Sequence, residues 1–399
     1  MLYPITGKIQ HYAWGGFDYL PHLLHIENNL HQPFAEYWLG AHPKAPSDIK
    51  RAADTETLDR LIAAEPEKYL GKPTADRFGR LPYLFKILDV HDMLSIQVHP
   101  SKAEAEKGFA RENASGIPLD AAERNYKDDN HKPEMMVALS PFYLLHGFMP
   151  ADRLKKQLAG IPELSALVTT FEQQGYKGLY SKVMNMAQQE VNTLLAPLLQ
   201  RIVPLYEQGQ LDREQPDFWA ARTLVSGMTD LQSLDRGIFS IYLFNLLRLQ
   251  PGEGIFQAAG VPHAYLEGQN IELMANSDNV LRGGLTPKHV DVDELLKHIA
   301  FEGVEPHLLK KAAGELRSRF PCPVPDFALE QITLEAEQQV PFQTASLEIA
   351  LMIQGTATFT GSVAVERSAG TALMISAGEH ITVTAKAPAL LFKAGVPLD

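Results

Sequence analysis

Hydrophobic and polar positions change their spacing along the chain, and this divides it into stretches of different texture. The first 150 residues contain short apolar runs of strand length, at 81–90, 93–99 and 134–139. Residues 151–235 instead carry apolar side chains at helical spacing among strong helix formers. The pattern therefore predicts strands first and then a block of helices.

Beyond this block the strand-like spacing returns, at 246–256 and 263–274. A helix is predicted to begin at Asp291, because Glu294 three residues later completes a capping-box pattern before an apolar pair. From about residue 327 onward the chain again consists of strand-like runs and turns, which is typical of a small sandwich or barrel. The glycines that mark its turns are Gly355, Gly361, Gly370 and Gly378.

This order of elements predicts a mainly β protein with an α-helical insertion. A chain of 399 residues is too long for one ordinary hydrophobic core. We expect a discontinuous β domain formed by 1–150 and 236–320, a helical insertion at 151–235, and an all-β domain at 325–399.

Composition excludes several classes of protein. Hydrophobic residues make up 45% and charged residues 21% of the chain, which is ordinary for a folded protein. The formal net charge of −12 argues against nucleic-acid binding, which requires clustered cations. An anionic substrate would need a local basic pocket against this overall sign.

The single cysteine, Cys322, rules out a disulfide framework or a thiolate metal site within the chain and indicates a reducing compartment. The N-terminal residues show neither a basic leader nor an apolar signal region, and no apolar run reaches the roughly 18 residues that a membrane span needs. We therefore expect a soluble, cytoplasmic protein that does not bind membranes.

The run 93–99 offers a first candidate site. If it is extended, Ser95, Gln97 and His99 share one face, opposite a wholly apolar face. A polar face without charge is typical of a hydrated cavity, although an ordinary exposed strand face would also fit. In the preceding run, Lys86 lies among hydrophobic residues and must either extend to solvent or meet an anion such as a phosphate.

Further ionisable groups follow at regular strand spacing. Lys132 and Glu134 would share a face, either as an exposed ion pair or as an amine beside a metal-binding carboxylate. Downstream, His263 and Tyr265 would share a face, and Glu272 lies between apolar neighbours. A polar loop then places two further candidates, Asp278 and Arg282, before two glycines.

Two imidazoles, one carboxylate and one amide oxygen form a plausible zinc site with room for water. Two histidines and one carboxylate would also suit iron in an oxygenase. Spacing in the sequence does not choose between these metals.

Several motifs together resemble the type I mannose-6-phosphate isomerases. The motifs are Gln97-Val98-His99-Pro100, YKDDNHKPEM, GVPHAY, and the run from Ser277 through Asp278-Asn279-Val280 to Arg282-Gly283-Gly284. The N-terminal YAWGG and AEYWLGAHPKAPS segments fit as well, so the resemblance covers the whole chain in order. It implies a cupin-like barrel with an inserted helical domain, and a zinc enzyme that interconverts D-mannose 6-phosphate and D-fructose 6-phosphate.

The resemblance also implies a set of site residues. The zinc ligands would be Gln97, His99, Glu134 and His263. The substrate pocket would contain Lys132, Glu272 and Arg282, with Ser95, Lys86, Tyr265 and Asp278 nearby. The C-terminal module has the glycine turns of a cupin, but its one histidine, His380, cannot supply a second metal set of this kind, so we interpret it as structural.

The isomerisation requires a base, a group that stabilises an enediolate, ring opening and a grip on the phosphate. We expect Lys132 to be the base, with Glu272 as the alternative, and Arg282 to stabilise the developing charge. Asp278, together with His99, would assist ring opening. Lys86 or Lys288, with Ser95 donating, would bind the phosphate.

Two other functions compete with this one. An iron-dependent cupin oxygenase would use the same histidines and carboxylate, but the cations around them would serve it poorly. A non-catalytic protein that binds sugar phosphates would need the pocket without turnover. For the isomerase we expect a small-molecule sugar phosphate as the partner, one Zn²⁺ per chain and a monomer.

Overall fold

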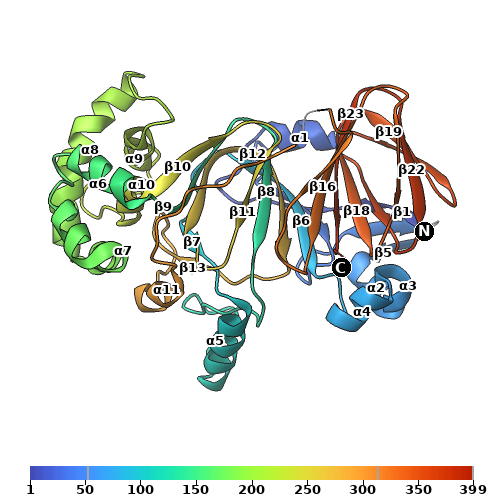
Figure 1. Cartoon of the computed structure of the whole chain (residues 1–399), viewed down its shortest axis with the longest axis horizontal. Helices are drawn as coiled ribbons and strands as arrows, with labels where there is room; N and C mark the ends of the chain where they lie inside the picture. Colours follow the sequence, from blue (N-terminus) through green and yellow to red (C-terminus); the bar gives the residue numbers. More distant parts are fainter. Residues whose placement is uncertain (52–53, 312–313, 398–399) are drawn as a thin grey trace.

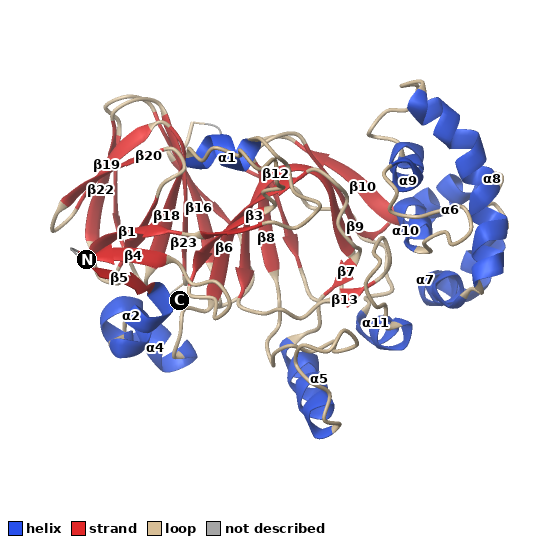
Figure 2. Cartoon of the chain, turned by 180° about the vertical axis from the view of Figure 1, so that it is seen from behind, coloured by secondary structure: helices blue, strands red, loops and turns tan. Residues whose placement is uncertain are grey.

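The computed structural model describes residues 1–51, 54–311 and 314–397. In these residues the strands form three sheets, and the molecule is elongated. A cluster of helices lies at one end, the C-terminal strands lie at the other, and a central barrel-like sheet lies between them (Figure 1). The view from behind shows the same order (Figure 2). This mainly β architecture with a helical region confirms the predicted fold class.

The central sheet carries the segments in which the candidate residues lie. Within the described residues its strands are β2 (Lys8–Gln10), β3 (Glu36–Gly40), β6 (Tyr83–Val90), β7 (Gln97–Val98), β8 (Glu134–Ala138), β9 (Phe142–Phe148), β10 (Phe244–Leu249), β11 (Glu253–Gln257), β12 (His263–Ala275), β13 (Leu281–Arg282) and β14 (Leu309–Lys310). Its main path runs β14-β11-β8-β12-β6-β3-β2, and β9, β10, β7 and β13 extend it from β12.

The long strand β12 joins the two parts of this sheet. Its first residues pair with β9 and β7, whereas its residues from Gly268 onward pair with β6 and β8. The register shifts between Tyr265 and Glu267, and Gly268 has a φ of 127°. A Cβ at Gly268 would meet the carbonyl oxygen of Pro141 at 2.7 Å, so this corner requires glycine. The bend turns both halves of β12 around one interior.

Two further sheets contain the C-terminal strands. The larger runs β15 (Arg317–Phe320), β16 (Ala328–Leu334), β23 (Ala389–Gly395), β18 (Glu348–Gln354), β21 (Ala372–Ile375), β1 (Leu2–Thr6), β4 (Asp48–Arg51) and β5 (Asp54–Thr57). The smaller runs β17 (Gln339–Gln343), β22 (His380–Ala385), β19 (Thr356–Thr360) and β20 (Ala364–Ser368). The N-terminal strand β1 thus pairs with β21, with Leu2 opposite Ile375. The boundaries between domains remain a prediction.

The helical end of the molecule arises mainly from the segment 151–235, in which the spacing predicts helices, and its last helix begins just beyond that segment. Its helices are α6 (Ala151–Ala159), α7 (Leu167–Asn185), α8 (Gln188–Glu207), α9 (Pro216–Val225) and α10 (Gly237–Leu243). They pack on β9 and β10 through one hydrophobic core, in which Phe148 and Phe244 contact Tyr180. This core gives the outer side of the central sheet a rigid support.

The remaining helices border the sheets. They are α1 (Tyr19–Leu24), α2 (Leu58–Ala64), α3 (Pro66–Leu70), α4 (Lys72–Phe78), α5 (Lys102–Ala114) and α11 (Val292–His298). The predicted start of α11 is confirmed, because the Asp291 side chain accepts a hydrogen bond of 2.9 Å from the Glu294 backbone N–H. Helix α5 follows His99 closely, and its cap Ser101 accepts from the backbone N–H of Glu104.

Candidate metal centre

Three buried side chains from separate strands converge inside the central sheet. His99 directly follows β7, Glu134 begins β8 and His263 begins β12. One potential ligand atom from each lies within 4.8 Å of the others. Proline precedes both Glu134 and His263 and fixes the backbone where each strand starts. The sequence thus delivers three metal-type donors from three distant segments to one point.

Backbone carbonyls orient both histidines. The Nδ1 atom of His99 lies 3.0 Å from the carbonyl oxygen of Asn279, and Nδ1 of His263 lies 2.9 Å from that of Val261. A carbonyl oxygen can only accept, so each Nδ1 carries the hydrogen and each Nε2 presents a lone pair. Both Nε2 atoms lie 3.3 Å from an oxygen of Glu134.

This arrangement fits a bound cation. Nε2 of His99 is fully buried and has no hydrogen-bond partner. Burial lowers the pKa of His99 to about 4, so the ring is neutral near pH 7 and its lone pair faces a carboxylate. Lone pairs of two rings and a carboxylate directed at one point repel one another unless a metal ion lies between them. Nitrogen and oxygen donors of this kind suit zinc.

Gln97 and Arg282 lie beside these donors through strand register. Gln97 on β7 is directly opposite His263 on one side and Arg282 on the other. Residues directly opposite in an antiparallel pair project from the same face. The structure therefore brings Gln97 next to His263, as a fourth ligand would require. Burial lowers the pKa of Arg282, which lies half-buried at the edge of this row.

Lys132 and Glu134 are ion-paired within the site. Lys132 Nζ lies 3.3 Å from Oε1 of Glu134. Burial opposes ionisation of Glu134, but the charge of Lys132 outweighs it and holds the pKa of this carboxyl well below its usual range. Glu134 is therefore a carboxylate that can bind a metal. The exposed ion pair considered from the sequence is not what the structure contains.

A second charged cluster lies farther along the same interior. Lys86 on β6 is buried, with Nζ 3.0 Å from Oε2 of Glu272 and 3.4 Å from Oε2 of Glu36. Burial works against the charged amine, but the two carboxylates outweigh it and raise the pKa of Lys86. Lys86 therefore does not extend to solvent, and the anions that it meets in the structure are two internal carboxylates.

Tyr265 is buried close enough to both clusters for their carboxylates to act on its hydroxyl. Burial raises its pKa well above the usual value, and the carboxylates of Glu272 and Glu134 add to this effect. The pKa of Glu272 is itself raised, first by burial, although Lys86 opposes this. The interior therefore combines a deprotonated carboxylate at Glu134 with a carboxyl at Glu272 that holds its proton more tightly.

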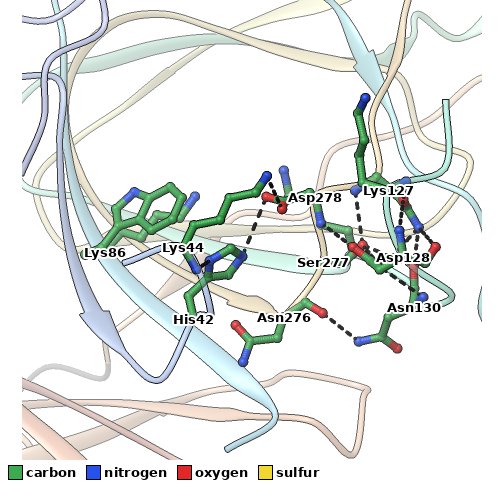
Figure 3. Close-up of polar contacts among 12 residues, drawn as sticks. His42, Lys44, Lys86, Lys127, Asp128, Asn130, Asn276, Ser277 and Asp278 are labelled. Carbon is green, nitrogen blue, oxygen red and sulfur yellow. Dashed lines mark hydrogen bonds and ion pairs between the residues drawn. The ribbon is translucent and has the colours of Figure 1, made fainter. Parts of the chain in front are cut away.

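Asp278 lies at the edge of the site in contacts that the sequence did not predict. Its Oδ2 is 2.7 Å from Nζ of Lys44, and its Oδ1 is 3.6 Å from Nε2 of His42 (Figure 3). Burial opposes its ionisation, but Lys44 and His42 lower the pKa of Asp278 below its usual value. His42 and Lys44 lie in the AEYWLGAHPKAPS segment, for which the sequence shows only the resemblance to the family.

The last two candidates are less buried than the metal donors. Ser95 is half-buried on the segment before β7, and Lys288 is exposed on the loop after β13. Burial of its amine and the nearby Arg282 lower the pKa of Lys288. Glu36 is not identified from the sequence as a residue of this interior. The signal that could have done so is its position two residues before Trp38, on the same face of β3, where the ring N–H of Trp38 donates to it.

Comparison with known proteins points to one family. The sequence model of a protein family, described as the catalytic domain of type I phosphomannose isomerase, matches residues 2–151. Mannose-6-phosphate isomerase of Shigella flexneri is 40% identical over 385 residues, which cover 94% of this chain and 95% of the relative. The enzyme of Homo sapiens is 33% identical, with 98% of each chain covered.

Solved structures agree with these relatives. A zinc-bound holo mannose 6-phosphate isomerase is 35% identical and superposes with a TM-score of 0.88, covering 100% of both chains. The Salmonella typhimurium enzyme bound to its substrate f6p and to zinc superposes with a TM-score of 0.87, at 35% identity and the same coverage.

No helix in the described ranges combines the length and apolar character needed to cross a membrane. The donor set, the fold and the relatives all lead to the same assignment. With 40% identity to a curated relative over 94% of its length, the chain belongs to the type I mannose-6-phosphate isomerase family.

Proposed function

We propose that this chain is a zinc-dependent aldose–ketose isomerase that interconverts D-mannose 6-phosphate and D-fructose 6-phosphate. The reaction moves a proton between C1 and C2 of the open-chain sugar through an enediol. The observation that carries this proposal is the buried convergence of His99, Glu134 and His263 in a chain that aligns from end to end with zinc-bound isomerases. No observation favours an iron oxygenase or a non-catalytic binding protein.

Gln97, His99, Glu134 and His263 would hold the zinc ion. When bound, zinc supplies a Lewis acid that orients the neighbouring sugar oxygens and stabilises negative charge on them. The two backbone carbonyls that accept from the Nδ1–H groups of the histidines keep both rings aimed at the same point. Holding the rings in this orientation reduces the cost of binding the ion.

Lys132 is our choice for the base that carries the proton between C1 and C2. It is largely buried, and its Nζ lies 3.3 Å from Oε1 of Glu134, the carboxylate that both histidines also face. Glu272 is the alternative, because it is buried and its raised pKa places it closer to the pH at which a carboxylate works as a base. Lys86 fixes its position through the 3.0 Å contact.

Arg282 would stabilise charge on the enediolate, since its half-buried guanidinium lies in register with Gln97. Asp278 would assist ring opening. Lys44 and His42 keep its carboxylate ionised and oriented. For the phosphate we propose Lys288 with Ser95, because Lys86 is already paired with two carboxylates.

The expected setting of the enzyme completes the proposal. We infer a monomer whose partner is a small sugar phosphate, without nucleic acid or membrane partners. The single cysteine, Cys322, is consistent with the cytoplasm, where phosphorylated sugars are available.

The decisive experiment combines metal analysis with a coupled assay on mannose 6-phosphate. The purified protein should contain one zinc ion per chain, chelation should lower turnover by roughly 100-fold or more, and added zinc should restore it. Absence of turnover in zinc-loaded protein would refute the isomerase. Turnover that required dissolved oxygen would favour the oxygenase.

The same assay assigns the base. Lys132→Ala should lower kcat by about 10² to 10⁴-fold while zinc content stays at one ion per chain. Glu272→Gln is the matched test of the alternative. A near-normal kcat in Lys132→Ala with a large loss in Glu272→Gln would transfer the role to Glu272.

A further inference from the structure

Two polar segments are fastened together beside the metal donors by one asparagine. The side chain of Asn279 is fully buried. Its Oδ1 accepts from the backbone N–H of Lys127 at 2.7 Å and of Asp128 at 3.2 Å. Its Nδ2 donates to the carbonyl oxygens of Asp128 at 2.8 Å and Asn130 at 2.9 Å. One amide therefore satisfies four backbone groups of the segment 127–130.

Asp128, in the segment 127–130, accepts hydrogen bonds from the segment 276–279. Its Oδ2 accepts from the backbone N–H of Asp278 at 2.7 Å, and its Oδ1 accepts from the hydroxyl of Ser277 at 2.8 Å (Figure 3). Asn130 adds a bond of 3.0 Å from its Nδ2 to the carbonyl of Asn276. The contacts run in both directions, so neither segment can shift without the other. We call Asp128 and Asn279 the loop clamp.

The loop clamp reaches the metal donors through one carbonyl group. The carbonyl oxygen of Asn279 accepts from Nδ1 of His99 at 3.0 Å and thereby aims Nε2 at Glu134. The N–H of Asn279 donates to the hydroxyl of Ser277 at 3.1 Å. The side chain and the N–H of Asn279 are thus both anchored, which leaves its carbonyl in one fixed orientation.

Each half of the loop clamp also precedes or adjoins residues with proposed roles. The segment 127–130 leads within a few residues to Lys132 and Glu134, and Asp278 lies within the segment 276–279. The clamp therefore sets the distance between the proposed base and the group proposed for ring opening. Among the described residues, the side chains of Asp128 and Asn279 form no hydrogen bond with the three metal donors.

We propose that Asp128 and Asn279 are positioning residues that set the zinc affinity of the site by holding His99 in its metal-binding orientation. This inference rests on the zinc site proposed above. Partners of metal-binding histidines typically change metal affinity by about 10 to 100-fold when they are lost. A clamp that acts through a backbone carbonyl should fall in this range.

The test measures zinc binding by competition with a chromophoric chelator, independently of turnover. Asn279→Ala should weaken zinc binding by about 10 to 100-fold. The matched control is Asn192→Ala on α8, where the side chain makes the same kind of loop contacts, donating to the carbonyl of Gln232 and accepting from the N–H of Leu234 at 3.2 Å. This control should lose stability but keep the zinc affinity of the native protein.

Thermal melting of the metal-free proteins separates positioning from general damage. If Asn279→Ala and Asn192→Ala lower the melting temperature similarly and only the former weakens zinc binding, the clamp acts on the site. Equal zinc affinity in Asn279→Ala and the native protein would overturn the proposal. Failure of the native protein to bind zinc would instead overturn the zinc site itself.

A double-mutant cycle tests whether the two residues act as one device. Asp128→Ala, Asn279→Ala and the double variant should show losses of zinc affinity that do not multiply, because either substitution opens the same clamp. Losses that multiply fully would show independent effects and contradict it. If an alanine variant does not fold, Asp128→Asn can replace it, because this substitution keeps the shape of the side chain and one acceptor oxygen. Asp128→Asn should still weaken zinc binding several-fold. Unchanged zinc affinity in Asp128→Asn would also refute the clamp.

Discussion

Two buried lysines, Lys86 in the central sheet and Lys393 in the C-terminal sheet, are each paired with two glutamates in the same way. Lys86 on β6 is directly opposite Glu272 on β12, and its Nζ also lies 3.4 Å from Glu36 on the other neighbouring strand. Both neighbours run antiparallel to β6. Each lysine is thus held between two carboxylates that come from both sides.

The C-terminal sheet repeats this register. Lys393 on β23 is directly opposite Glu330 on β16, at 3.4 Å between Nζ and Oε2, and lies 2.5 Å from Glu348 on β18. The second glutamate also has the same place in both clusters. Glu36 lies two residues before Trp38, which is directly opposite Lys86. Glu348 lies two residues before Ala350, which is directly opposite Lys393.

The two clusters differ in what surrounds them. In the C-terminal sheet, Arg317 closes the cluster by donating to both oxygens of Glu330, at 2.8 and 3.0 Å. In the central sheet, the cluster shares its interior with the histidines, Glu134 and Lys132. Among the described residues, His99, Glu134 and His263 form the group found with metal-binding geometry. A buried ion cluster is therefore not a site by itself; adjacent metal donors and a nearby amine make it one.

The largest expected effect separates the two lysines by function. Lys86→Met should lower kcat by about 10²-fold or more, because Glu272 loses the cation that fixes its position and charge. Lys393→Met should leave kcat per folded molecule unchanged. The measurement is the coupled isomerase assay with zinc content verified. An equal loss of kcat in both variants would show that the two lysines do not differ in function.

A smaller effect concerns stability, and here the two clusters should behave alike. Removing one partner of a buried ion pair costs about 3–5 kcal/mol, because an unpaired charge remains. Lys393→Met should destabilise the protein by this amount in chemical denaturation, and adding Glu348→Leu should recover much of the loss. Lys86→Met with Glu272→Leu should likewise recover stability while remaining inactive. No recovery in either double variant would mean that the ion pairs themselves hold the sheets together.

The smallest effect is a pH dependence at the closed cluster. Burial raises the pKa of Glu330, but Lys393 and Arg317 outweigh it, so the pKa in the folded state lies below the usual value. Such a carboxylate contributes stability that is present above its unfolded pKa and lost as the pH falls through the folded value. The free energy of unfolding should therefore decrease less steeply on acidification in Glu330→Gln than in the native protein. Parallel slopes would show that Glu330 does not contribute.

The donors that the structure brings together, His99, Glu134 and His263, lie in the short motifs that carry the family resemblance, and this resemblance, rather than strand spacing, predicts them as ligands. His99 and His263 were placed correctly relative to turns and prolines, and the register of the strands then brought Gln97 beside His263. The extended run at 93–99 was predicted to be longer than it is. Strand β7 covers only Gln97–Val98, and the flanking N–H of Ile96 bonds instead to the carbonyl of Gly284.

Long-range pairings could not be predicted. Glu272 lies 186 residues from Lys86, so no local pattern could show that the amine is already neutralised. The clamp between Asp128 and Asn279 spans 151 residues, and each half resembles an ordinary polar turn until the other is present. Spacing within a segment indicates which face a residue takes. It does not indicate which distant segment covers that face.

The pairing of β1 with β21 also constrains how the chain is made. Leu2 is synthesised long before its partner Ile375, because most of the sequence lies between them. At typical elongation rates of about 5–20 residues per second, β1 waits for tens of seconds without the strand that completes it. During this interval the edge of β1 that faces β21 is open to other chains, whereas its opposite edge can already pair with β4. Successful synthesis therefore depends on keeping this open edge from aggregating until β21 emerges.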